Sequence, residues 1–161
     1  MPNTLPPDHP RPVVVLDINV LISALISRRE DFAPPARILS AWKRDELVIA
    51  LSESMIDKID EVLHRPALFR FLSARFSPDD VGEQIQDFLR SLRRQARITP
   101  GVLDIKTIED DPEDDTVIIT AVESQAECIV SGDRHLKNLG SYQNIPILSP
   151  AEFVNQYTIL P

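Results

Sequence analysis

The sequence predicts an α/β fold with a central parallel sheet. Four short apolar runs are rich in β-branched residues and lack polar alternation, as expected of parallel strands that are buried on both faces. Helical patterns lie between these runs, and such alternation of strand and helix is typical of layered folds with right-handed crossovers. The chain has 161 residues, which is enough for one domain and little more.

The strands are expected where apolar residues run together. The four buried strands are predicted at Val13–Leu16, Leu47–Leu51, Cys128–Val130 and Ile145–Leu148. A weaker strand is expected over Ile98–Val102, where Pro100 and Gly101 favour the edge of a sheet.

Three helices have recognisable starts. In each, Ser or Asp can cap the free backbone amides, and the proline that follows is tolerated at the first helical position. These starts are Ser77-Pro78, Asp111-Pro112 and Ser149-Pro150.

Two helical faces carry apolar stripes. After Ser77 the stripe forms either core or a partner surface, and it consists of Val81, Ile85, Phe88, Leu89 and Leu92. The segment 114–125 should pack against the sheet just before the third buried strand, through Val117, Ile118, Ala121 and Val122.

Charge and motifs narrow the classes of ligand that the protein could bind. The net charge of -8 opposes non-specific binding of nucleic acid by the whole surface, so a polyanionic substrate needs local cations or metal ions. Neither a GxGxxG motif nor a phosphate-binding loop is present, which argues against dinucleotide and nucleoside-triphosphate binding.

Other features of the sequence concern where in the cell the protein is expected. No stretch is long and apolar enough to span a membrane, and residues 1–11 form a proline-rich stretch that we expect to be a flexible tail. The single cysteine, Cys128, lies in an apolar run, as expected of a buried residue in a reducing compartment such as the cytoplasm.

Three aspartates are the candidate catalytic residues. Asp17 directly follows the first strand, Asp133 follows the third buried strand, and Asp114 lies in the first turn of a predicted helix. Ligands of open parallel sheets bind beyond the carboxyl ends of the strands, so these acids could meet at one edge. Clustered carboxylates suit Mg²⁺ or Mn²⁺, although each could equally be a helix cap.

Two parts of the sequence resemble the PIN domain family. The string VVVLDINVLISALI resembles its opening strand and helix, with Asp17-Ile18-Asn19 at the motif Asp-Thr-Asn. The string DPEDDTVIITAVESQAECIVSGDRHL resembles its later half, with Ser131-Gly132-Asp133 after a strand. The segment between them, with Trp42 and Arg65-Pro66, is similar to PIN domains that are toxins of toxin-antitoxin pairs.

The resemblance implies a three-layer α/β/α fold over residues 12–157 and a ribonuclease activity that depends on Mg²⁺ or Mn²⁺. It implies that Asp17, Asp114 and Asp133 bind metal and that Asn19 and Ser131 orient them. It also implies an antitoxin partner and a homodimer. On the rim after the last aspartate, Arg134, His135 and Lys137 are candidate RNA contacts.

One residue departs from the family pattern at a site position. The family has a second acid, a glutamate, where this chain has Lys58, so an ammonium replaces a metal ligand. Glu61 lies one turn along nearly the same helix face, whereas Asp57 is rotated by about 100°. Either the ribonuclease is active but weakened, or the domain is inactive and binds RNA or a protein.

Overall fold

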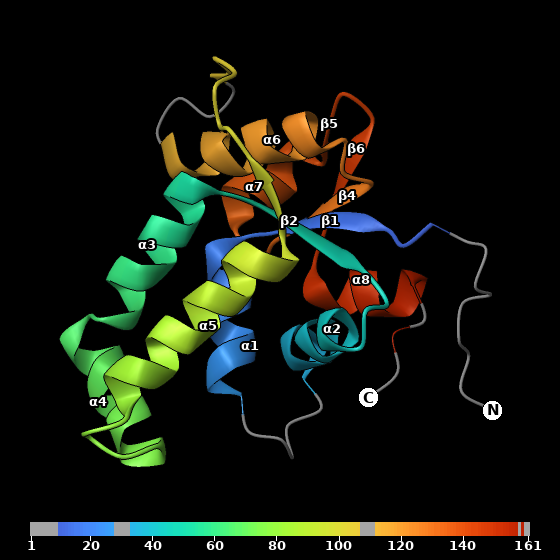
Figure 1. Cartoon of the computed structure of the whole chain (residues 1–161). Helices are drawn as coiled ribbons and strands as arrows, with labels where there is room; N and C mark the ends of the chain where they lie inside the picture. Colours follow the sequence, from blue (N-terminus) through green and yellow to red (C-terminus); the bar gives the residue numbers. More distant parts are fainter. Residues whose placement is uncertain (1–9, 28–32, 107–111, 158, 160–161) are drawn as a thin grey trace.

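A six-stranded sheet forms the middle layer of the described part of the chain, in the order β3-β2-β1-β4-β6-β5 (Figure 1). The computed structural model describes residues 10–27, 33–106, 112–157 and 159. Neighbouring strands are parallel except for β5 and β6, which are antiparallel. The strands are β1 (Val13–Leu16), β2 (Val48–Ser52), β3 (Arg97–Thr99), β4 (Cys128–Val130), β5 (Ser141–Tyr142) and β6 (Ile145–Leu148).

Helices cover both faces of this sheet, which gives three layers. Figure 1 shows α6 and α7 on one side of the sheet and α1, α2 and α8 on the other. The helices are α1 (Ile18–Ile26), α2 (Pro34–Lys43), α3 (Glu53–Leu63), α4 (Pro66–Arg75), α5 (Val81–Gln95), α6 (Pro112–Ser124), α7 (Arg134–Leu139) and α8 (Pro150–Gln156). The predicted α/β/α architecture is therefore confirmed. None of the helices in the described ranges is long and apolar enough to cross a membrane.

The core lies against the middle strands. Leu16 of β1, Leu51 of β2 and Ile129 of β4 are fully buried, because helices cover both faces of the sheet. This explains why these strands lack polar alternation. Cys128 is also buried, and burial raises the pKa of its thiol to about 12, so the thiol stays protonated and unreactive.

Most strand predictions are confirmed, with differences in their bounds. β2 begins one residue later than expected. β3 lies at the edge of the sheet, as expected, but it ends before Pro100. β5 was not predicted, since it has two residues and joins β6 through Gln143 and Asn144, both of which have positive φ. Positive φ at both central positions is typical of a two-residue hairpin turn, but Gln-Asn is a weak sequence signal for it.

The helix starts have mixed outcomes. Ser149 caps α8 as predicted, because its Oγ accepts a hydrogen bond from the amide of Glu152 at 3.1 Å. The start at Ser77-Pro78 was wrong: these residues belong to a turn, and α5 begins at Val81 after Asp80. Asp111 lies outside the described residues.

Candidate functional site

The candidate site lies where the strand order reverses. From β1 the chain adds β2 and β3 on one side, and β4 then pairs with β1 on the other side. In open α/β sheets the loops diverge at such a point, and ligands bind in the crevice beyond the carboxyl ends of the strands. Asp17 follows β1 here, and Ser131 follows β4.

Ser131 connects the two strand ends. Its Oγ donates to Asp17 Oδ2 at 2.7 Å and accepts from the amide of Asp133 at 3.0 Å. The amide of Asp17 in turn donates to the carbonyl of Val130 at 2.9 Å. The hydroxyl therefore fixes the carboxylate of Asp17 relative to Asp133, as the family resemblance implies for this serine.

Asp17 sits in an environment that disfavours its negative charge. The side chain is buried, and burial is the largest cause of a pKa above the ordinary value for aspartate. The charge of Asp133 raises the pKa further, whereas the hydroxyl of Ser131 and the amides of Ile18 and Asn19 lower it. A bound cation would relieve this cost.

The other two aspartates are each tied to a helix start. Asp133 caps α7, since its Oδ1 accepts from the amides of His135 at 2.8 Å and Leu136 at 3.3 Å. Asp114 is buried in the first turn of α6. The capping interpretation is thus correct for Asp133, but the cap engages Oδ1 and the residue still lines the site.

One pocket brings the three aspartates together. It has a volume of about 240 Å³. Its lining comprises Asp17, Ile18, Asn19, Lys58, Val62, Arg65, Glu113, Asp114, Val117 and Asp133. Aspartates from distant parts of the sequence therefore line one acidic pocket, as strand-end reasoning predicts.

Lys58 occupies the same pocket and is paired with two glutamates. Its Nζ lies 3.0 Å from Glu113 Oε1 and 3.2 Å from Glu61 Oε1. Hydrogen bonds that Lys58 donates to Glu113, first, and to Glu61 raise the pKa of Lys58, so it remains an ammonium. Glu61 is exposed and is not part of the pocket lining, and it also accepts from Arg65.

The remaining predicted residues lie around the rim. Asn19 also lines an adjoining pocket of about 380 Å³, together with Arg134. His135 is exposed, and Lys137 pairs with Glu152 at 3.6 Å. No residue pattern pointed to Arg65 or Glu113 as pocket residues, because their positions depend on how α3 meets α4 and α6.

The donor set suits a hard divalent cation. Asp133 lies close enough to Asp17 for its charge to raise the pKa of Asp17. Mg²⁺ is often held by one or two carboxylates with water as the remaining ligands. In the described ranges, no three acidic, histidine or cysteine side chains gather closely enough to hold an ion. Asp17 and Asp133 therefore fit a metal site in which few ligands come from the protein.

The family of the chain follows from its sequence. The model for the PIN domain matches residues 13–135, which is more than half of the chain. The chain belongs to the PIN domain family. No curated protein matches it, so no named relative adds an activity to the family assignment.

The matched range contains every residue that lines the pocket of the three aspartates. It begins at β1, spans the three aspartates and Lys58, and ends at His135 in α7. PIN domains have a nuclease fold and generally use divalent metal ions.

Proposed function

We propose that this PIN domain is a ribonuclease of the toxin type, which hydrolyses phosphodiester bonds within RNA in the cytoplasm with Mg²⁺ or Mn²⁺. The observation that carries the proposal is the convergence of Asp17, Asp114 and Asp133 on one pocket of a nuclease fold. Like charges from distant parts of the chain repel one another in one pocket, and a bound cation offsets that repulsion.

The proposed roles follow from the contacts. Asp17 and Asp133 hold the cation, with Asp114 as a third carboxylate in the same pocket. Ser131 keeps the Oδ2 of Asp17 in place, and Asn19 lies beside them on the rim. When bound, the metal ion lowers the pKa of a water molecule and stabilises negative charge on the scissile phosphate.

Lys58 favours a second candidate function. An ammonium that lines the metal pocket repels a divalent cation and supplies no ligand. This observation supports an inactive PIN module that binds RNA or a protein without cleavage. Between the two candidates, the carboxylates support a weakened ribonuclease, and Lys58 sets how weak it is.

Replacing Asp17 tests the ribonuclease. Asp17→Asn removes a charged ligand but keeps an acceptor for Ser131, so we expect at least a 100-fold loss of Mn²⁺-dependent cleavage of a mixed RNA pool, with an unchanged circular dichroism spectrum. Asp79→Asn, at an exposed position outside the pocket, is the matched control and should cleave as the wild type does. Equal cleavage by Asp17→Asn would contradict the assignment.

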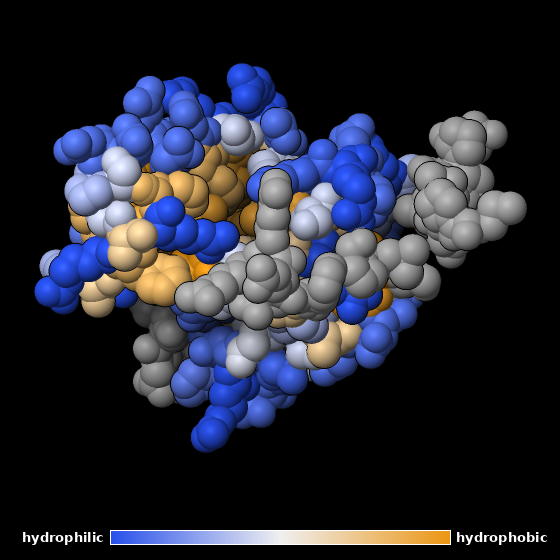
Figure 2. Space-filling model, turned by 90° about the horizontal axis from the view of Figure 1, so that it is seen from below, coloured by the Kyte–Doolittle hydropathy of each residue, from blue (hydrophilic) through white to orange (hydrophobic). Residues whose placement is uncertain are grey.

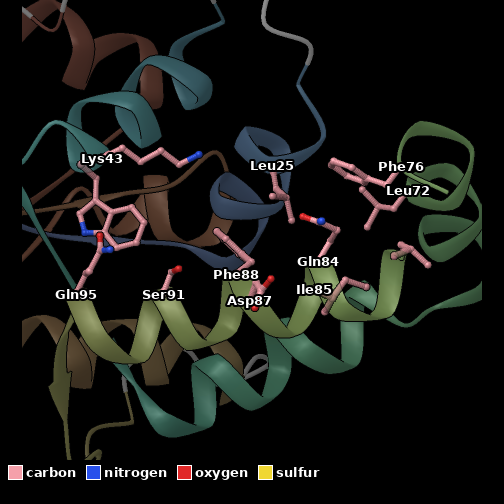
Figure 3. Close-up of a pocket in the computed structure, with 12 residues that line it drawn as sticks. Leu25, Lys43, Leu72, Phe76, Gln84, Ile85, Asp87, Phe88, Ser91 and Gln95 are labelled. Carbon is pink, nitrogen blue, oxygen red and sulfur yellow. The ribbon is translucent and has the colours of Figure 1, made fainter. Parts of the chain in front are cut away.

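An apolar groove between α5 and the C-terminal end of α1 is the proposed surface for a protein partner. Figure 2 shows hydrophobic side chains in a hollow bordered by hydrophilic ones, and the close-up in Figure 3 shows α5 along one wall. The groove has a volume of about 330 Å³. Its apolar lining is Leu25, Trp42, Leu72, Phe76, Val81, Ile85 and Phe88.

This groove suits an amphipathic helix. Such a helix would insert apolar side chains spaced three or four residues apart, which is how grooves between helices commonly bind partners. We assign it to an antitoxin protein, or to a second copy of the chain in a homodimer. Three phenylalanines lie in or just after α4: Phe76 lines the groove, Phe71 is exposed outside it and Phe69 is half-buried.

A further inference from the structure

Two cationic side chains line the pocket of the three aspartates. They are Lys58 of α3 and Arg65, the residue before α4, and together we call them the basic wall. Among the described residues that line this pocket they are the only cations. The pocket therefore combines carboxylates that suit a metal ion with cations that suit an anion.

An anion already bridges the basic wall. Glu61 Oε1 accepts from Lys58 Nζ at 3.2 Å and from an Arg65 guanidinium nitrogen at 3.3 Å. Because both nitrogens contact the same oxygen atom, they are close enough for one phosphate group to reach both. The carboxylate of Glu61 thus shows where an anionic oxygen binds.

The bridging carboxylate is weakly held. Glu61 is 59% exposed and Arg65 is 56% exposed, and ion pairs at such exposure contribute little because water screens them. Glu113, the other partner of Lys58, is 63% exposed. A phosphate group can therefore replace Glu61 on the basic wall at small cost, while the carboxylate of Glu61 returns to water.

The whole molecule is negatively charged, so an anionic ligand needs local cations such as those of the basic wall. The chain carries a net charge of -8, and three aspartates line the pocket itself. Arg93 is paired with Glu53 and Asp57, and Arg134 lines the adjoining pocket that also contains Asp133. Within the pocket of the three aspartates, the charges that favour a polyanion are those of Lys58 and Arg65.

We propose that Lys58 and Arg65 bind a backbone phosphate of RNA beside the three aspartates, and that Glu61 competes with that phosphate for both cations. The proposal rests on RNA as the ligand in the proposed function. It gives Lys58 a role of its own: the residue that replaces a metal ligand holds the substrate.

The test measures binding without cleavage. A fluorescently labelled single-stranded RNA is titrated in EDTA by fluorescence anisotropy, at several salt concentrations. For single strands, the slope of log affinity against log salt changes by about 0.7 for each phosphate contact. We expect Lys58→Ala and Arg65→Ala each to weaken binding by about three- to tenfold and to lower the slope by about 0.7.

Two further variants separate this role from a structural one. Lys43→Ala removes an exposed lysine from a different pocket and should leave affinity and slope unchanged. Glu61→Gln removes the competing charge and should tighten binding, whereas a purely structural Glu61 would give weaker binding or none. Circular dichroism confirms that each variant is folded.

The outcomes distinguish this inference from the proposed function. If Lys58→Ala and Arg65→Ala keep the affinity and slope of the wild type, or if the wild type does not bind RNA in EDTA, the basic wall is overturned. Binding through the wall with no Mn²⁺-dependent cleavage would overturn the ribonuclease and leave the wall standing. If the wild type cleaves RNA with Mn²⁺ but Lys58→Ala and Arg65→Ala bind RNA as it does, the basic wall is overturned and the ribonuclease stands.

Discussion

Asp17 combines a buried position with a charge that the fold disfavours. Its raised pKa means that the folded chain binds a proton more tightly than the unfolded chain does. The stability from this proton is complete below the ordinary aspartate value, near 3.8, and is lost as the pH rises through the raised pKa. At neutral pH the metal-free protein therefore carries the cost of a buried carboxylate.

This cost predicts that Asp17→Asn stabilises the metal-free protein. At pH 7 in EDTA the variant should have a larger free energy of unfolding than the wild type, measured by urea denaturation. The difference should shrink as the pH falls through the raised pKa and level off below about 3.8. A variant less stable than the wild type at pH 7 would show that the contacts of Asp17 outweigh its burial.

We expect Lys58 to lower the affinity of the pocket for metal ions. Lys58→Glu replaces a repelling charge with a ligand, so calorimetric titration with Mn²⁺ should show at least tenfold tighter binding than the wild type. Cleavage measured at saturating RNA should rise with it, although the phosphate contact of Lys58 is lost. Lys58→Gln removes the repulsion alone and should fall between the two. If Lys58→Glu gains neither metal binding nor cleavage, the site has diverged at more than this position.

Sequence reasoning located the acids of the site but not their neighbours. Asp17, Asp114 and Asp133 follow strands or begin a helix, and the topology brings such positions to one sheet edge. Glu113 at the start of α6 pairs with Lys58 of α3. That contact depends on the packing of α3 near α6, which no spacing within either segment encodes.

At the level of elements, the cap of α8 allows a direct measurement. Ser149→Ala removes the acceptor for the amide of Glu152 and should lower the free energy of unfolding by about 1 kcal/mol. Thermal or urea unfolding measures this loss, and Ser149→Asp should restore most of the stability since it can also cap. Ser149 lies outside the acidic pocket, so cleavage should not change.

The elements also show what local patterns can and cannot predict. The apolar runs identified β1, β4 and β6 because buried parallel strands contain little else. At Ser77 the same local logic gave a wrong helix start, because the Ser77 hydroxyl donates to Asp80 Oδ2 and residues 78–80 form a turn before α5. A cap signal and a turn signal use the same residue types there.

For the whole molecule, the groove beside α5 predicts self-association. We expect the wild type to sediment as a dimer and Phe88→Asp to sediment as a monomer, because a carboxylate in an apolar contact loses its hydration. Phe88 is only half-buried, so the fold should survive. Phe71→Asp, exposed outside the groove, is the control and should remain a dimer. A monomeric wild type would contradict self-association, and the groove would then be a surface for a different protein.

The pairing of β1 with β4 also governs when the site can exist during synthesis. Asp17 emerges from the ribosome early, but Ser131, which holds its carboxylate, follows 114 residues later. A nascent chain that ends before β4 has the first aspartate and neither its serine nor Asp133. Contacts between such distant residues form late, since the intervening chain must first be ordered. An unfinished polypeptide therefore has no assembled site, and the RNA being translated beside it is not exposed to one until most of the chain has been made.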